Sequence, residues 1–153
     1  MSVVRVDAPG ALSSLQDRGR FGWRHMGVPW SGALDPEALA VANRLVGNPP
    51  HAPAIECFEG GLMLTAEDGG VRLAVAGSAR MRIDGASGSR SVDSWRSFDL
   101  EPGDCLRLQA CEGRQRCALV AVHGLQVPLQ LGSASTYARA QLGGMEGRNL
   151  RAG

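Results

Sequence analysis

The spacing of apolar positions is helical in one stretch of the chain and alternating in most of the rest. One helical face is formed by a set of apolar residues: Leu34, Ala38, Leu39, Ala42, Leu45 and Val46. Asp35 is suited to cap the start, Pro36 to occupy the first turn, and Gly47 to follow the last turn. The sequence therefore predicts one main α-helix over about residues 35–46.

Short alternating segments predict β-strands on both sides of this helix. A first strand is expected at Val3–Val6, and others at 54–58, 62–65, 71–76, 80–84, 106–108 and 116–122. Glycine- and aspartate-rich turns separate them, which is typical of a β-barrel or sandwich with one helix packed against it. Residues 13–33 have no apolar period and several glycines, so they are predicted to form a long loop of the kind that often carries function.

The last stretch, residues 132–153, is rich in Gly, Ser and Arg and has few large apolar side chains. Such a segment buries too little apolar surface to offset about 1–2 kcal/mol of backbone ordering per residue. It either lies in a groove of the domain or leads to further protein. We therefore expect a β-domain at 1–131 and a segment at 132–153 that precedes a second half absent from this chain.

Composition narrows the class of protein. The chain has 153 residues and a net charge of +1, which suits one globular domain and gives no reason to expect nucleic acid or a membrane as partner. No apolar run approaches the ~20 residues of a membrane span, and the charged start does not resemble a signal peptide, so we expect a cytoplasmic protein. The four cysteines lack zinc-site spacing and are predicted to be reduced thiols on strands, with no metal.

The sequence contains no lysine, and all 16 of its basic Lys/Arg positions are arginine. A Schiff-base lysine, a lysine general base and the lysine of a phosphate-binding P-loop are therefore excluded from this chain. Arginine stays charged at working pH, so it can position an anion but cannot serve as a base.

Six dense motifs follow one another along the chain, at residues 16–20, 27–35, 42–48, 54–56, 131–136 and 143–148. Together they resemble the biotin-dependent carboxyltransferase family. That family includes the C subunit of 5-oxoprolinase, the second allophanate hydrolase subunit, the KipI antagonist and the carboxyltransferase domain of urea carboxylase. The resemblance implies a mainly β fold, a cyclophilin-like β-barrel with one main α-helix.

The chain departs from the family pattern in two respects. Family members are longer, so the resemblance implies an amino-terminal half whose active site is completed by a second half. In addition, Cys117 and the run His123-Gly124-Leu125-Gln126-Val127-Pro128 stand where the family has a tyrosine and a Gly-Gly-hydrophobic-Asp-Val-Pro run. These replacements affect one edge of the implied site.

The resemblance implies three functions. The first is a subunit of an ATP-dependent 5-oxoprolinase that acts on a lactam or amide, inactive without the missing half and without partner subunits equivalent to the A and B subunits of 5-oxoprolinase. In that case ATP is expected in the complex, with a partner subunit as the candidate for holding it. The second is biotin-dependent carboxyl transfer to urea or a related amide, which needs a separate biotin carrier. The third is a non-catalytic module that binds a partner subunit and regulates it.

Three residues are candidates for catalysis. His25 is a candidate general acid or base because of its residue type, although a histidine in a loop is also commonly a surface or packing residue. Glu56 is expected on a partly buried strand face, where burial raises a carboxyl pKa and suits proton transfer; a structural pair with an arginine is the alternative. Asp17 can orient an arginine that binds a substrate carboxylate.

Substrate binding is assigned to side chains suited to a small anion or amide. Arg18 and Arg20 can each bind a carboxylate bidentately, or instead form an internal salt-bridge network that fixes the loop. Ser31 lies before the helix start, which can bind an anion unless the cap occupies it. The remaining candidates are the two helix-end amides, the hydroxyl-rich segment and an arginine that could complete it: Asn43, Asn48, Ser133, Ser135, Thr136 and Arg148.

Overall fold

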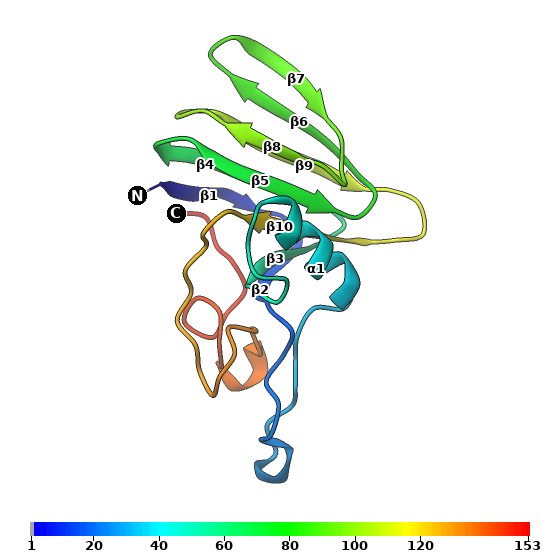
Figure 1. Cartoon of the computed structure of the whole chain (residues 1–153), viewed down its shortest axis with the longest axis vertical. Coiled ribbons are helices and arrows are strands. Elements are labelled where there is room, and N and C mark those ends of the chain that lie inside the picture. Colours follow the sequence, from blue (N-terminus) through cyan, green and yellow to red (C-terminus); the bar gives the residue numbers. More distant parts are fainter. Residues whose placement is uncertain (1) are drawn as a thin grey trace.

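The computed structural model describes residues 2–153, which form ten β-strands, one α-helix and two short 3₁₀ helices (Figure 1). The strands are β1 (Val3–Pro9), β2 (Leu12–Gln16), β3 (Ala54–Phe58), β4 (Leu62–Asp68), β5 (Val71–Ala76), β6 (Ala79–Gly85), β7 (Gly88–Val92), β8 (Ser97–Leu100), β9 (Cys105–Cys111) and β10 (Cys117–Val122). The helices are α1 (Pro36–Leu45), η1 (Arg24–Met26) and η2 (Ala138–Ala140). The predicted mainly β fold class is confirmed.

The strands form two five-stranded antiparallel sheets that enclose one apolar core. The first sheet has the order β1-β4-β9-β6-β7 and the second β2-β3-β10-β5-β8. Alternate side chains point into the core from both sheets, for example Leu106 and Leu108 from β9 and Leu73 and Val75 from β5. Arg107, between Leu106 and Leu108 on β9, and Arg72, directly before Leu73 on β5, lie on the opposite faces of these strands, as period-two patterning requires.

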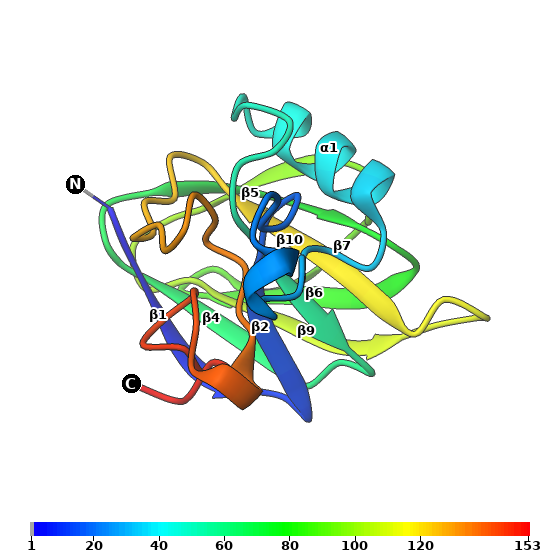
Figure 2. The same ribbon diagram turned by 90° about the horizontal axis from the view of Figure 1, so that it is seen from below.

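Helix α1 covers the outer face of the second sheet, over β10 and β5 (Figure 2). Ala38 and Ala42 are buried against small side chains of the sheet such as Ala74 and Ala121, which allow a close approach. The side chain of Asp35 caps the helix, accepting a hydrogen bond from the Ala38 N–H at 2.9 Å. The predicted helix is confirmed to within a residue at each end. Leu34, assigned to its apolar face, instead precedes the helix and is 70% exposed.

Strand β2 was missing from the sequence prediction, which placed a loop from residue 13 onward. Residues 12–16 pair with β3, with Ser14 opposite Glu56 and Gln16 opposite Ala54. Apolar alternation fails here because the buried positions of β2 include Ser13, Ser14 and Gln16. Two other strands, β7 and β8, are likewise rich in polar residues and were also missed.

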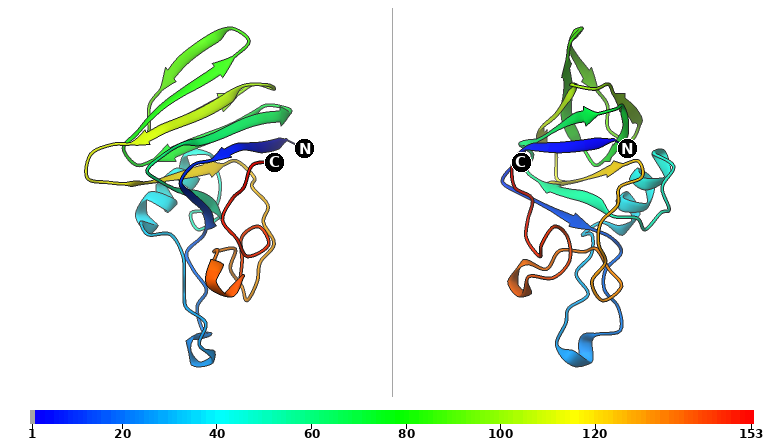
Figure 3. Two further views of the ribbon diagram at one scale, coloured as in Figure 1. Left: turned by 180° about the vertical axis from the view of Figure 1, so that it is seen from behind. Right: turned by 90° about the vertical axis from the view of Figure 1, so that its left-hand side faces the viewer.

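Residues 18–34, which include most of the rest of that predicted loop, project from the body of the molecule and are termed the arm (Figures 1 and 3). The outgoing and returning segments of the arm meet at its root. There the Arg20 N–H donates to the Trp30 carbonyl at 2.6 Å and the Ala33 N–H donates to the Asp17 carbonyl at 2.9 Å. Gly32 has φ +98°, and a Cβ there would lie 2.9 Å from the Arg18 carbonyl oxygen. A glycine is therefore required for the close approach of the outgoing and returning segments of the arm.

The carboxyl-terminal segment, residues 132–153, lies in this domain, along β2 and β1 (Figure 1). Backbone N–H groups of Thr136 and Leu150 donate to carbonyls of Leu15 and Ser13 at 2.9 and 2.8 Å. The segment therefore packs against this domain, held by backbone hydrogen bonds and by apolar contacts such as that of Leu150 with the core, and a second half beyond it stays a prediction. No helix in residues 2–153 has the length and apolar content needed to span a membrane.

All four cysteines lie on strands as free thiols, as predicted. Burial is the main cause that raises the pKa of Cys111 to about 11 and that of Cys117 to about 12. Burial also raises the pKa of Cys57, whereas Cys105 is partly exposed. Since the thiolate is the nucleophile, iodoacetamide at about pH 8 should label Cys105 well before the others. Peptide mass spectrometry of native protein would contradict this if Cys57, Cys111 or Cys117 were labelled first.

Candidate functional site

Asp17, directly after β2, is the centre of a buried polar cluster. Its Oδ1 accepts hydrogen bonds from the hydroxyls of Ser133 and Ser135, both at 2.6 Å, and from the Gly19 N–H at 2.8 Å. Its Oδ2 accepts from the Ala134 N–H at 2.7 Å. Four donors compensate for taking this charge out of water, since Asp17 is only 6% exposed. The cluster thus fastens the carboxyl-terminal segment to the end of β2.

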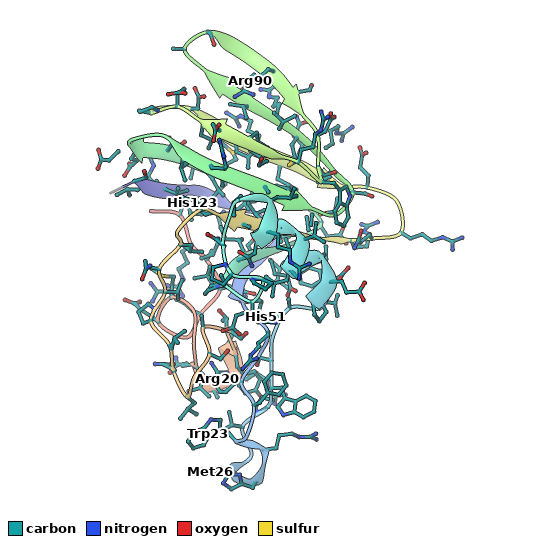
Figure 4. All side chains as sticks on the ribbon, viewed as in Figure 1. Arg20, Trp23, Met26, His51, Arg90 and His123 are labelled. Atoms are coloured by element: carbon teal, nitrogen blue, oxygen red, sulfur yellow. The ribbon has the colours of Figure 1, made fainter. Side chains whose placement is uncertain are left out.

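Arg20 binds the carbonyl groups of the same segment at the root of the arm (Figure 4). Its Nε donates to the Gln130 carbonyl at 2.9 Å, and its Nη2 donates to the carbonyls of Ser135 at 2.8 Å and Ser133 at 3.4 Å. The side chain is fully buried, and its Nη1 has no hydrogen-bond partner among the described residues. The segment 133–135 is therefore held between an aspartate that accepts from its donors and an arginine that donates to its acceptors.

This arrangement corrects part of the sequence interpretation. The structure does bring Asp17, Arg20, Ser133 and Ser135 together, as a shared binding site for a small anion would require. However, their polar groups bind one another and the backbone, and all four side chains are buried. Bidentate binding of a substrate carboxylate by Arg20 would require its hydrogen bonds to the backbone carbonyls to break. In this geometry the cluster is a structural fastening, and Asp17 orients the segment rather than an arginine.

Glu56 on β3 is a buried carboxylate whose contacts leave one oxygen uncommitted. It is 6% exposed, and its Oε2 accepts a hydrogen bond from the Leu34 N–H at 2.7 Å. Burial raises the pKa of Glu56, and the hydrogen bond from Leu34 opposes this to a lesser extent. No arginine in the described residues pairs with it, so the structural ion pair considered as its alternative is absent there. A carboxyl group with a raised pKa is suited to accept or donate a proton near neutral pH.

Ser14 and Gln16 extend this polar patch and were not selected from the sequence. Ser14 lies opposite Glu56 in the β2–β3 ladder, and Gln16 is two residues further on the same face. Gln16 Nε2 donates to Ser14 Oγ at 2.9 Å and to the Thr136 carbonyl at 3.2 Å, while its Oε1 accepts from the Gly32 N–H at 3.2 Å. Gln16 thereby links β2, the arm root and the carboxyl-terminal segment. The available signal was the i, i+2 spacing of two polar residues before the Asp17 motif.

Asn43 and Asn48 connect the end of α1 to neighbouring loops. Asn43 is fully buried; its Nδ2 donates to the Ala52 carbonyl at 2.8 Å and its Oδ1 accepts from Asn48 Nδ2 at 3.1 Å. Asn48 also donates to the Val122 carbonyl at 2.9 Å and accepts from the Gly124 N–H at 2.9 Å. Their amides are used in this network, so the geometry gives them a positioning role rather than an open substrate-binding role.

The other predicted site residues do not join either cluster. His25 is exposed in η1, beside Met26 at the tip of the arm (Figure 4). Arg18 is also exposed on the arm, and Arg148 is ion-paired with Glu146 at the surface. Ser31 lies at the arm root with a left-handed φ of 53°. Thr136 is buried, and its hydroxyl has no partner among the described residues.

An open groove of about 770 Å³ lies at the amino-terminal end of α1, next to Glu56. It is lined by Leu34, Asp35, Pro36, Glu37, Phe58, Arg114, Gln115, Arg116 and Cys117. Glu56 itself does not line the groove, but its hydrogen-bond partner Leu34 does. Glu56 is thus joined to the rim of an open groove by the hydrogen bond from the Leu34 N–H.

Residues 26–153 match the family described as the carboxyltransferase domain, subdomain A and B. The chain belongs to this family, as the six sequence motifs indicated.

Individual relatives support the same assignment. The chain is 36% identical to the 5-oxoprolinase C subunit of Escherichia coli over 152 residues, which is 99% of this chain and 47% of that protein. It is 32% identical to urea amidolyase of Saccharomyces cerevisiae over 99% of this chain and 8% of that protein. The chain therefore spans about half the length of the 5-oxoprolinase polypeptide that it matches.

Solved structures show the same fold. The crystal structure of the urea amidolyase of K. lactis superposes with a TM-score of 0.88 at 33% identity, over 97% of this chain and 9% of that one. The crystal structure of the urea carboxylase of Kluyveromyces lactis gives a TM-score of 0.88 at 33% identity, over 97% of this chain and 13% of that one.

Proposed function

We propose that this chain is a component of an ATP-dependent 5-oxoprolinase, acting with partner subunits on the lactam of 5-oxoproline. The observation that carries the proposal is the similarity to two bacterial 5-oxoprolinase C subunits, at 36% and 34% identity over 99% and 92% of this chain. Those proteins are named as subunits, which supports an assembly of several polypeptides. Because the chain spans 47% and 44% of them, we assign the rest of the active site to protein beyond these residues.

Within this proposal Glu56 is the general base or acid. Its burial and raised pKa favour a proton-transfer role, and it adjoins the groove at the start of α1. The second carboxylate oxygen of Glu56 accepts no hydrogen bond from the described residues, so it is the atom that exchanges a proton with the substrate. Gln16 and Ser14 keep the surrounding backbone in place.

The residues of this chain do not offer a nucleotide site of their own. There is no lysine to hold a phosphate, and the buried hydroxyls of Ser133 and Ser135 already donate to Asp17. We therefore assign ATP to a partner subunit, where it supplies the driving force for opening a stable lactam. A biotin carrier, which requires a lysine for attachment, would also be a separate polypeptide segment.

Replacing Glu56 with glutamine tests the proposal. The Gln amide oxygen can still accept from the Leu34 N–H, so the fold should persist while the proton acceptor is lost. In the complex co-expressed with its partner subunits, we expect ATP-dependent 5-oxoproline hydrolysis to fall by about 100-fold or more in kcat, the usual contribution of a general base.

The pH dependence provides a second readout. A base acts when deprotonated, so the wild-type rate should fall as the pH drops through the raised pKa of Glu56, above the usual range for glutamate. The Glu56→Gln variant should not show this fall in rate as the pH drops. Glu67→Gln is the matched control, since Glu67 is exposed and paired with Arg5, which does not line the groove. Full activity of Glu56→Gln with the wild-type pH profile would reject the assigned role.

Carboxyl transfer is the second candidate, supported by the superposition on K. lactis urea carboxylase. Incubating the complex with a carboxylated biotin carrier and urea would distinguish the two, because only a carboxyltransferase consumes carboxybiotin. A stable complex that shows neither activity would favour the third candidate, a module that regulates its partner.

A further inference from the structure

The arm exposes more large apolar surface than a solvent loop requires. Phe21 is 49%, Met26 66% and Trp30 47% exposed, and all three belong to residues 18–34. Large apolar side chains gathered on one projecting element are typical of a protein–protein contact. The labelled residues Trp23 and Met26 lie at the end of this projection, away from both sheets (Figure 4).

The arm is also the cationic element of the fold. Residues 18–34 include Arg18, Arg20 and Arg24 and no Asp or Glu. Among the described residues none of these three arginines forms an ion pair, whereas eight other arginines do. The exposed guanidinium groups of Arg18 and Arg24 are therefore available to carboxylates of a partner.

The exposed side chains of the arm are already arranged in a stack. The Arg18 guanidinium lies 5.8 Å from the centre of the Phe21 ring, the Phe21 and Trp30 rings are 5.3 Å apart, and the Arg24 guanidinium lies 5.0 Å from the Trp30 ring. Cation–π and ring contacts of this kind hold both charges against the aromatic surface. The stack contains Trp and Arg, the residue types that dominate binding energy at interfaces.

The root of the arm is held by a buried side chain and by close backbone contacts. Arg20 is fully buried there, and the outgoing and returning segments approach through Gly19 and Gly32, where a Cβ would meet carbonyl oxygens of the opposite segment at 3.0 and 2.9 Å. At the tip, the N–H groups of Gly27 and Val28 donate to carbonyls of Arg24 and Trp23 at 2.9 and 3.3 Å. A preorganised arm loses little conformational entropy on binding.

We propose that the arm is the docking element for a partner subunit whose receiving surface is an apolar pocket rimmed by carboxylates. The inference rests on the proposed function, because the partner belongs to the same enzyme complex. The rim is expected to carry carboxylates because the arm carries unpaired arginines and no acidic residue. The pocket is expected to be apolar because it receives the Phe21 and Trp30 rings.

Matched pairs of variants test the proposal with the purified chain and its purified partner subunits. Trp30→Ala and Arg24→Glu should each weaken binding by about tenfold or more, as expected for hot-spot residues. Trp95→Ala is the control for the ring, since Trp95 is also 47% exposed but lies between β7 and β8. Arg96→Glu is the control for the charge, and both controls should bind within about twofold of wild type. Added salt should weaken wild type more than Arg24→Glu.

A photo-crosslinking residue at Met26, compared with one at Val41 on α1, gives an independent readout. Crosslinks from position 26 to a partner subunit, absent from position 41, support the proposal. It is overturned if Trp30→Ala and Arg24→Glu bind like their controls, or if position 26 crosslinks to a second copy of this chain or to nothing. Thermal unfolding should be unchanged in both arm variants because the replaced side chains are exposed.

The catalytic assay separates this inference from the proposed function. Binding that depends on the arm, in a wild-type complex that does not hydrolyse 5-oxoproline, rejects the function and keeps the docking role. If the complex hydrolyses 5-oxoproline but assembles equally well with the arm variants, the docking role is rejected and the proposed function is kept.

Discussion

Arg20→Ala is expected to destabilise the protein by about 3 kcal/mol or more, because each buried carbonyl that loses its donor costs about 1–3 kcal/mol. The substitution removes the guanidinium donor from the carbonyls of Gln130, Ser133 and Ser135. It also leaves a void where a fully buried side chain had packed. Urea unfolding followed by circular dichroism measures the loss.

Arg18→Ala is the matched control for Arg20→Ala. Arg18 lies two residues earlier on the same loop but is exposed, so its removal should change the free energy of unfolding by about 0.5 kcal/mol or less. If Arg20→Ala were as stable as Arg18→Ala, the guanidinium would not be holding the segment. A role for Arg20 in binding substrate would then regain priority.

Gly143→Ala is expected to be similarly severe. Gly143 has φ +68°, and a Cβ there would lie 2.0 Å from the Ser135 carbonyl oxygen and 2.7 Å from Arg20 Nη2. A left-handed conformation costs an alanine about 1–2 kcal/mol, and overpacking adds about 1–3 kcal/mol. Because the clash falls on the Arg20–Ser135 contact, the same unfolding experiment should show a loss of about 2–5 kcal/mol.

Gly132→Ala separates backbone strain from the clash. Gly132 has φ +80° in the same segment, but nothing lies within 4 Å of an added Cβ. This control should lose only the conformational part, about 1–2 kcal/mol. Equal losses for the two glycine variants would mean that the segment moves freely away from Arg20.

The stability of this cluster affects how activity data should be read. A variant such as Arg20→Ala that abolishes hydrolysis would do so by releasing residues 130–136 from β2, without touching a substrate. Glu56→Gln avoids this difficulty, because the substituted side chain keeps an acceptor for the Leu34 N–H. The two kinds of substitution therefore distinguish the fastening from the proposed chemistry.

The sequence alone determined the elements whose causes are local. The cap at Asp35, the proline after it and Gly47 predicted α1 because capping acts within a few residues. Apolar alternation predicted β5, and a nearly continuous apolar run predicted β10, which is buried at every position. The ordered motifs indicated the family for the same reason, since each is a short run of residues.

Only the tertiary structure decided what the polar residues do. Strand β2 was missed because its buried Ser13, Ser14 and Gln16 show no apolar period. Arg20 was interpreted as a substrate ligand, yet its partners lie 110–115 residues away along the chain. Such contacts leave no mark in local spacing, because a hydrogen bond satisfies a buried polar group equally well from any distance in sequence. The uncommitted carboxylate of Glu56 and the unpaired arginines of the arm became visible only once all other partners were known.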